Sequence, residues 1–151
     1  MSGARVEKSV IFDMDGTLAD VAHRRHHVTE RPKNWPAFNA AMHKDPPNTP
    51  IIEMARVFAD AGWHILICTG REERYRTVTE DWLARHDVPH ERLYMRATAD
   101  YRPDHVIKLE ILGRIRDAGF EPHISVDDRD SVVAMWRAAG LTCLQCAEGD
   151  F

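Results

Sequence analysis

The strongest constraint on the fold of this chain is an apolar run, Ser9-Val10-Ile11-Phe12, that ends in Asp13-Met14-Asp15-Gly16-Thr17. A short apolar run bounded by turn residues is typical of a buried strand in a parallel sheet. Side chains two positions apart on an extended chain point the same way, so Asp13 and Asp15 are expected to share a face. Two carboxylates this close repel each other unless a cation lies between them or one keeps its proton. The motif therefore indicates a phosphate and metal site, with a turn at Gly16 whose N–H groups hold an anion, or else a solvated acidic turn.

Two further strand-like runs end in polar residues. Ile65-Leu66-Ile67-Cys68 leads into Thr69-Gly70-Arg71, and Ile124-Ser125-Val126 leads into Asp127-Asp128-Arg129-Asp130. Lys108 lies near the start of a helical stretch. Ligands of open parallel sheets lie beyond the carboxyl ends of the strands, so we expect these motifs to meet the first one at a single edge.

Strand and helix patterns alternate along the chain, which predicts an α/β fold with a Rossmann-like parallel sheet flanked by helices. Expected strands are 8–12, 63–68, 93–95, 121–126 and 141–146. Expected helices run from Thr49-Pro50 to Gly62, from Tyr75 to before Val88-Pro89, from Val106 to Gly119, and over 131–139. Thr49 is expected to cap the first of these helices through its hydroxyl.

The bulk composition is that of an ordinary globular protein. A chain of 151 residues predicts one domain over 1–151. A net charge of −4 argues against non-specific coating of nucleic acid, although local basic patches stay possible. No apolar run approaches the ~20 residues of a membrane span, so we expect no membrane partner. Three cysteines, at 68, 143 and 146, form no disulfide framework and fit a reducing cytoplasm.

Together the four motifs resemble those of the haloacid dehalogenase superfamily of phosphotransferases. The final stretch from Asp127 through Gly149-Asp150-Phe151 is similar, more narrowly, to the phosphatase domain of the phage polynucleotide kinase/3′-phosphatase family. The stretch from Met95-Arg96 to Lys108 is similar to the same domain. The kinase domain of that family needs a Gly-x4-Gly-Lys phosphate loop, and no glycine here is followed by lysine, so we expect a phosphatase without the kinase.

The resemblance implies a role for each catalytic residue. Asp13 would be the nucleophile that forms an acyl phosphate, and Asp15 the general acid and then the general base. Thr69 would donate a hydrogen bond to the phosphate, although a helix cap is the alternative. Lys108 would offer a positive charge to the phosphate, unless it is a surface lysine.

The resemblance also implies an Mg²⁺ site with all-oxygen ligands. Its residues would be Asp13, Asp15, Asp127 and Asp128, with Asp15 contributing its backbone carbonyl rather than its side chain. Which of Asp127 and Asp128 binds the metal directly stays open. Asp130 is expected to cap a helix or to support the site.

Five arginines match arginines at corresponding places in the phage domain: Arg24, Arg71, Arg96, Arg102 and Arg129. Gly70 is expected to let the backbone approach the phosphate closely. Arginine binds phosphate with two parallel hydrogen bonds, so these side chains are expected to hold the reacting phosphate or its neighbours. Arg24 and Arg96 are the favoured contacts to a polynucleotide. His23 and His105 replace acidic residues of the phage enzyme, so substrate contacts are expected to differ in detail.

Residues 20–48 lie between the first two motifs, where the superfamily inserts caps, and are predicted to form a small helical flap. A flap this short leaves the site open to a large substrate. His23, His26 and His27 have the spacing of a metal-chelating helix face, but a basic helix face is favoured. The tryptophans are expected in the core or under the flap, with base stacking by Trp35 as the lesser alternative; they are Trp35, Trp63, Trp82 and Trp136.

The leading functional prediction is a Mg²⁺-dependent polynucleotide 3′-phosphatase. Its substrate would be 3′-phosphorylated nucleic acid ends, DNA or RNA, and a separate kinase or ligase is a possible partner. A small-molecule phosphatase or nucleotidase of the same superfamily is the alternative. A non-enzymatic binding module is the third interpretation, and the complete set of motif residues argues against it. The sequence does not predict the oligomeric state.

Overall fold

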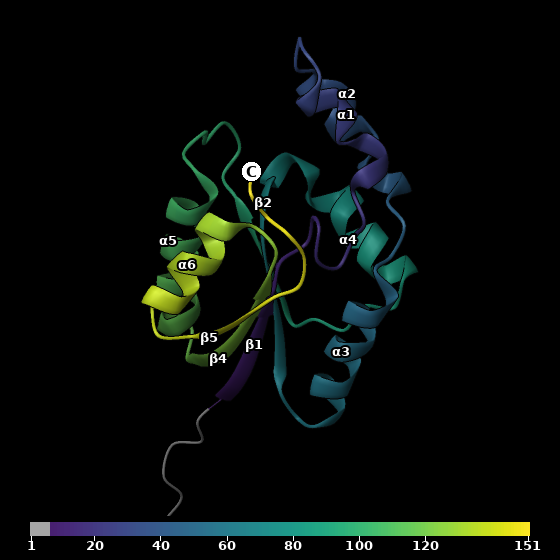
Figure 1. Ribbon diagram of the computed structural model, residues 1–151. Helices are drawn as coiled ribbons and strands as arrows, with labels where there is room; N and C mark the ends of the chain where they lie inside the picture. Colours follow the sequence, from purple (N-terminus) through teal and green to yellow (C-terminus); the bar gives the residue numbers. More distant parts are fainter. Residues whose placement is uncertain (1–6) are drawn as a thin grey trace, which may run out of the picture.

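The computed structural model describes residues 7–151, and its centre is one five-stranded parallel sheet with strand order β3-β2-β1-β4-β5 (Figure 1). The strands are β1 (Glu7–Phe12), β2 (His64–Glu72), β3 (Arg92–Arg96), β4 (Phe120–Asp127) and β5 (Thr142–Gln145). The predicted α/β fold class is confirmed. Because β1 is central and pairs with both β2 and β4, the residues that follow it lie in the middle of the carboxyl edge.

Four longer helices flank the sheet, four short ones lie in the segment after β1, and a fifth short one follows β2. The longer helices are α3 (Thr49–Asp60), α4 (Arg76–Arg85), α5 (Asp104–Asp117) and α6 (Asp130–Ala138). The short ones are η1 (Ala22–Arg24), α1 (His26–Thr29), α2 (Trp35–Ala40), η2 (Met42–Lys44) and η3 (Glu73–Tyr75). None of the helices in the described part of the chain is long and apolar enough to cross a membrane.

The helices cover the sheet from both sides, with α3 and α4 on one face and α5 and α6 on the other (Figure 1). Side chains alternate along β1, so Val10 and Phe12 pack with the first pair of helices and Ile11 with the second. All three are almost completely buried. Burial of each such side chain is worth about 1.5–3 kcal/mol, which fixes the strand that carries the first motif.

Strand β2 is longer than predicted. It was expected to end at Cys68, but it continues to Glu72, and its pairing with β3 becomes irregular between Thr69 and Glu72. Arg96 stabilises this extension because its Nε donates a hydrogen bond to the Gly70 carbonyl, at 2.8 Å. The second motif therefore lies on the last residues of a strand rather than on the loop beyond it.

Two local predictions were wrong. Helix α3 begins at Thr49 itself and has no capping hydrogen bond from a side chain, because Asn48, which precedes it, donates to the Thr17 carbonyl instead. Trp35 is not buried: 53% of its surface is exposed, and its ring packs edge-on against Phe38 in a flap too small to cover it. By contrast, Trp82 and Trp136 are core residues, as predicted.

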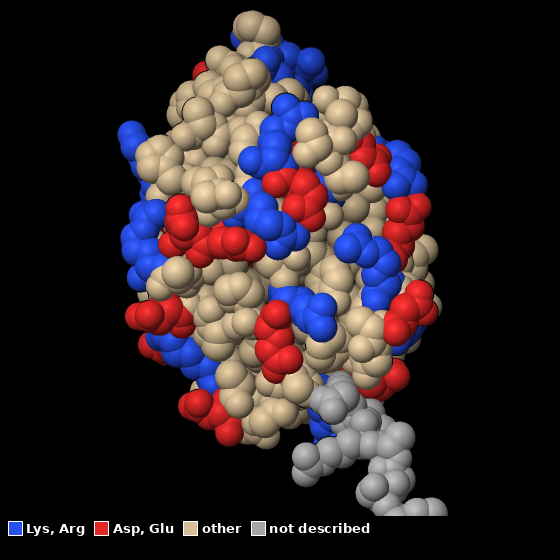
Figure 2. Space-filling view, turned by 180° about the vertical axis from the view of Figure 1, so that it is seen from behind, with Lys and Arg blue, Asp and Glu red and all other residues tan. Residues whose placement is uncertain are grey.

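Charged side chains are mixed over the surface. Figure 2 shows acidic and basic side chains interspersed over the face opposite to that of Figure 1. This distribution agrees with the modest net charge of −4. Any attraction for a polyanion is therefore local rather than spread over the whole surface.

Candidate active site

Three buried carboxylates meet at the carboxyl edge of the sheet. Asp13 follows β1 and Asp127 ends β4, and these neighbouring strands are in register at Phe12 and Val126. With Asp128, they place one oxygen each within 4.8 Å of one another. In the described residues this acidic triad is the one such cluster of potential metal ligands.

Lys108 on α5 links two members of the acidic triad. Its Nζ lies 2.8 Å from Asp13 Oδ1 and 2.9 Å from Asp127 Oδ2, and only 1% of the residue is exposed. Trp136 Nε1 donates a further hydrogen bond to Asp127 Oδ2, at 3.2 Å. Burial alone would lower the pKa of Lys108, but the charges of Asp127 and Asp13 raise it well above its usual value. The ammonium group therefore stays charged at neutral pH.

One lysine does not balance three carboxylates. Burial, followed by the charge of Asp127, raises the pKa of Asp13 well above its usual range, although Lys108 acts in the opposite direction. Burial raises the pKa of Asp128 as well. Thr17 Oγ1 donates to Asp13 Oδ2, at 3.1 Å, and holds that oxygen in place. The site thus has a surplus of negative charge that a cation would neutralise.

The donor set of the acidic triad fits a hard divalent cation. Asp128 Oδ2 is buried and has no hydrogen-bond partner among the described residues, which is costly for a carboxylate unless something else binds it. The backbone at Gly16 approaches this oxygen so closely that a Cβ there would lie 2.1 Å from it. Carboxylate oxygens are the ligands that Mg²⁺ prefers in proteins, so the geometry suits that ion.

Asp15 has a different environment from Asp13. Its side chain is directed to two guanidinium groups: Arg71 Nη2 lies 2.6 Å and Arg24 Nη2 2.9 Å from its Oδ1. Burial tends to raise the pKa of Asp15, but the arginines outweigh it and lower the pKa below its usual value. The side chain of Asp15 is therefore held apart from the acidic triad, and only its backbone lies on the turn that carries Asp13.

The sequence analysis missed Asp45, which holds both of these arginines. Its buried carboxylate accepts from Arg24 Nε at 2.7 Å, from Arg24 Nη2 at 2.8 Å and from Arg71 Nη2 at 3.1 Å. Trp82 Nε1 donates to the backbone carbonyl of Asp45, at 2.8 Å. In the sequence Asp45 precedes two prolines and has the appearance of a turn residue, so no local signal identifies it.

Arg24 was favoured as a contact to a polynucleotide, and this stays a prediction. The structure places the side chain in the interior, with 0% exposure and its guanidinium 4.2 Å from the centre of the Phe38 ring. Besides its bonds to carboxylates, its Nη1 donates to the Phe38 carbonyl, at 3.3 Å. The contacts that we observe therefore support the position of Asp15.

Two further candidate arginines, Arg96 and Arg129, contact Asp104, which the sequence analysis did not identify as a site residue. Arg96 forms an ion pair with Asp104 and also donates to the carbonyls of Gly70 and Asp100, at 2.8 and 2.9 Å. Arg129 Nη1 lies 2.9 Å from Asp104 Oδ2. Asp104 thus connects the end of β2 to the residue that follows the acidic pair.

The remaining two predicted residues lie on either side of this region. Arg102 is exposed, and its guanidinium pairs with Asp100 at 2.8 Å and with Glu110 at 2.6 Å. Thr69 is buried at the end of β2, where its Oγ1 accepts a hydrogen bond from the backbone N–H of Arg71, at 3.1 Å. The hydroxyl proton of Thr69 remains available to a ligand.

Comparison with known proteins agrees with this geometry. The sequence profile of the family described as polynucleotide kinase PNKP phosphatase domain matches residues 7–151. A chain of the Pnkp1/Rnl/Hen1 complex superposes with a TM-score of 0.85 and 33% identity, over 99% of this chain and 49% of that one. A chain of the Pnkp1/Rnl/Hen1 RNA repair complex superposes with a TM-score of 0.82 and 33% identity, over 100% of this chain and 46% of that one. The present chain therefore spans about half the length of these relatives.

A more distant solved structure shares only the fold. The class C acid phosphatase from Bacillus anthracis with tungstate bound superposes with a TM-score of 0.67 and 15% identity, over 86% of this chain and 55% of that one. At this level of identity the likeness extends to the sheet and its helices, and it does not identify a substrate.

Replacement of Gly16 by alanine should disrupt the acidic triad specifically. Gly16 and Gly62 both have positive φ, 81° and 90°, so alanine at either position should cost about 1–2 kcal/mol in backbone strain. Only at Gly16 would the new Cβ meet Asp128; at Gly62 nothing lies within 4 Å. We expect both variants to melt a few degrees lower, and only Gly16→Ala to lose at least about tenfold in affinity for Mg²⁺ by calorimetric titration, which is ~1.4 kcal/mol. Equal affinities in the two variants would contradict the assignment of Asp128.

Proposed function

Because this chain belongs to the family of polynucleotide kinase PNKP phosphatase domains, as its motifs predicted, we propose that it is a Mg²⁺-dependent polynucleotide 3′-phosphatase. The observation that carries this proposal is the separation of its two motif carboxylates. Asp13 lies in the acidic triad with Lys108, whereas Asp15 is held by Arg24 and Arg71. Hydrolysis of a phosphomonoester through an aspartyl phosphate needs two acids in two such different environments.

Asp13 is the proposed nucleophile. One of its oxygens attacks phosphorus, the bond from phosphorus to the sugar oxygen breaks, and an aspartyl phosphate forms. Two like charges 4 Å apart repel by about 4 kcal/mol at an effective dielectric constant near 20, so the approach needs compensating positive charge. Lys108 supplies part of it from a buried position 2.8 Å from Asp13. When bound by the acidic triad, Mg²⁺ would supply the rest.

Asp15 is the proposed acid and base. In the first step it gives a proton to the leaving sugar oxygen, and in the second it takes a proton from the water that hydrolyses the aspartyl phosphate. The arginines fix where its carboxyl group points, so that the same oxygen can serve both steps. A dianionic phosphate beside Asp15 opposes the effect of the arginines on its pKa, because like charge favours the protonated form.

The product of this reaction suggests its partners. Removal of a terminal 3′-phosphate leaves a free 3′-hydroxyl, which is the end that a joining reaction requires. A chain of an RNA repair complex shares 33% identity with this one. We therefore propose that a separate ligase or kinase acts on the same nucleic acid ends.

The first experiment compares three substrates side by side: a 3′-phosphorylated oligonucleotide, a 3′-mononucleotide and an aryl phosphate. We expect the highest kcat/KM with the oligonucleotide, because contacts beyond the reacting phosphate add binding energy. Asp13→Asn should still fold and should lose more than about 10³-fold in turnover, because it removes the nucleophile at constant volume. Equal or better kcat/KM with the mononucleotide would favour the alternative, a nucleotidase.

Activity should require Mg²⁺ and should be inhibited by Ca²⁺. Calcium also binds carboxylate oxygens, but it prefers longer bonds and more ligands, and it would displace the phosphate from its line of attack by Asp13. Phosphate release would be measured after chelation and after re-addition of each ion. Full turnover in excess chelator would contradict the metal assignment.

Asp45→Asn tests whether the buried carboxylate acts through Asp15. The variant keeps the volume but lets Arg24 and Arg71 move, and so misplaces the acid. We expect the first chemical step to slow by about 10–100-fold more for a sugar phosphate than for an aryl phosphate, since the aryl group leaves with less protonation. Asp15→Asn should give the same pattern more strongly.

The control for Asp45→Asn is His23→Ala. His23 Nε2 contacts Asp45 Oδ1 at 2.7 Å, and the substitution leaves the two arginine contacts in place. Its effect on either substrate should be smaller. Equal slowing of both substrates in Asp45→Asn, measured before the steady state, would show that the carboxylate supports the fold rather than the acid.

A further inference from the structure

Three aromatic side chains of the described residues are largely exposed, and all lie on segments at the carboxyl edge of the sheet. Trp35 is 53% exposed in the flap, Tyr101 is 80% exposed in the loop after β3, and Phe151 is 60% exposed in the segment after β5. Aromatic side chains exposed near a site are candidates for stacking with the bases of a nucleic acid. Of the three, Phe151 is the one whose ring contacts arginines near the acidic triad, Arg25 and Arg129.

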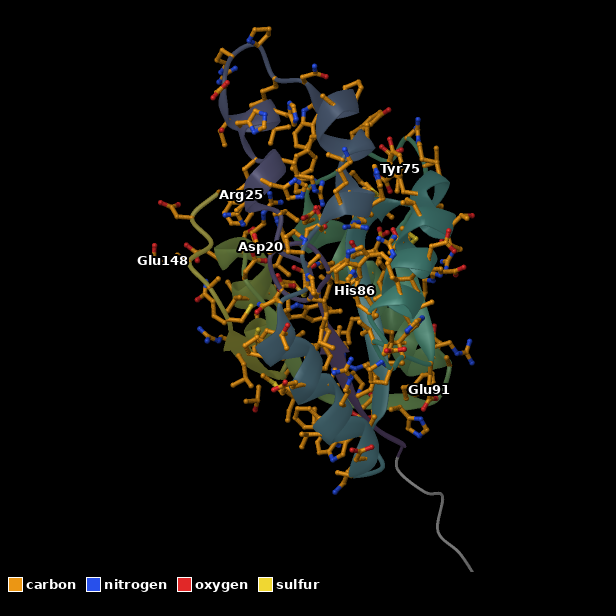
Figure 3. All side chains as sticks on the ribbon, turned by 90° about the vertical axis from the view of Figure 1, so that its right-hand side faces the viewer. Asp20, Arg25, Tyr75, His86, Glu91 and Glu148 are labelled. Atoms are coloured by element: carbon orange, nitrogen blue, oxygen red, sulfur yellow. The ribbon has the colours of Figure 1, made fainter. Side chains whose placement is uncertain are left out.

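Two arginines flank Phe151. The Arg129 guanidinium carbon lies 4.8 Å from the centre of the ring, and that of Arg25 lies 5.5 Å from it. Arg25 Nη2 is also 4.0 Å from Asp128 Oδ2, which is the unpartnered oxygen of the acidic triad. In Figure 3, Arg25 lies at the base of the flap, beside the segment that carries Glu148. The ring therefore borders the entrance to the site.

The position of Phe151 is set by the loop that carries the acids. The backbone N–H of Asp130 donates to the Gly149 carbonyl at 2.9 Å, and Gln145 Nε2 donates to the Asp128 carbonyl at 3.0 Å. A Cβ at Gly149 would lie 1.7 Å from the Asp128 carbonyl oxygen, so the two segments are in close contact there. This packing keeps the ring beside the acidic pair.

We propose that the exposed ring of Phe151, with Arg25 and Arg129 beside it, binds the terminal base of an unpaired 3′ end. This proposal rests on the proposed function and names the part of the substrate that the surface recognises. A base stacked on an aromatic side chain contributes about 1–3 kcal/mol and tolerates any base, because every base has a π-face. The guanidinium groups attract the attached phosphates.

The charges around the ring indicate the side on which the nucleic acid lies. A hollow of about 470 Å³ next to Phe151 has three carboxylates in its lining, those of Asp130, Glu148 and Asp150. Negative charge there repels phosphate groups. Arg25, by contrast, contacts both the Phe151 ring and Asp128 of the acidic triad. The strand is therefore expected to pass over Arg25 and away from this hollow.

The test uses two oligonucleotides with a 3′-phosphate, one complete and one whose last residue lacks its base. Phe151→Ala should raise KM for the complete oligonucleotide by at least about fivefold, which corresponds to ~1 kcal/mol, and leave the abasic one within about twofold. Phe151→Trp should keep the low KM, and Phe151→Leu should behave like alanine. An aryl phosphate is not a suitable control, because its own ring can stack.

Val57→Ala is the matched control for loss of an exposed apolar side chain. Val57 is 67% exposed in the last turn of α3, which leads into the start of β2 and so lies away from the carboxyl edge of the sheet. Its KM should stay that of the wild type. An equal loss on both oligonucleotides, or no change in KM on either, would overturn the stacking proposal and leave the wild-type preference for oligonucleotides intact. If the proposed function itself were wrong, the result would be different. The wild type would then show no preference for the oligonucleotide, and there would be no basis for base stacking.

Discussion

The charge balance around Lys108 is the constraint on which the rest of the site depends. A fully buried ammonium group is stable here because it contacts Asp13 and Asp127 at 2.8 and 2.9 Å. Conversely, those two carboxylates tolerate their burial because the lysine lies between them. The third carboxylate, Asp128, is left with one buried oxygen that accepts no hydrogen bond from the described residues. The protein therefore folds with a site whose charge only an additional cation completes.

The segment between β1 and α3 contributes charged residues to the site. Asp45 and Arg24 both come from the segment between β1 and α3, and together with Arg71 they hold the side chain of Asp15. The alternating order of carboxylates and guanidinium groups satisfies every member of the network with charge-assisted hydrogen bonds. A small insertion at the sheet edge can thus orient an acid without the bulk of a separate cap domain.

The loop that carries Asp127 and Asp128 is held by close contact with the backbone of two other segments. Gly16 lies against the Asp128 side chain and Gly149 against the Asp128 carbonyl, and neither position has room for a Cβ. Glycine is required at these two places because two chain segments meet there, in addition to the positive φ of Gly16. The loop of the acidic pair is consequently fixed from both sides, which restricts the movement of the Asp128 carboxylate.

The sequence by itself determined the fold class, the order of the strands along the chain and the motifs that end them. Hydrophobic periodicity is a local signal: β1 differs from the expected bounds by one residue at its start, and β4 by one residue at each end. Parallel sheets bring strand ends together, so the meeting of Asp13, Thr69 and Asp127 at one edge also followed from the pattern. The resemblance of the motifs to a known family added the chemical roles.

Only the tertiary structure decided which arginines face the interior and which carboxylates they hold. Asp45 is 32 residues from Asp13 in the sequence, and nothing near it distinguishes a buried anion from a turn residue. Arg24 and Arg102 look alike in the sequence, yet one is completely buried and the other exposed. Such partnerships depend on how the flap packs against α4 and the end of β2. The free energy of a charge pair depends on its burial, and burial is a property of the whole fold.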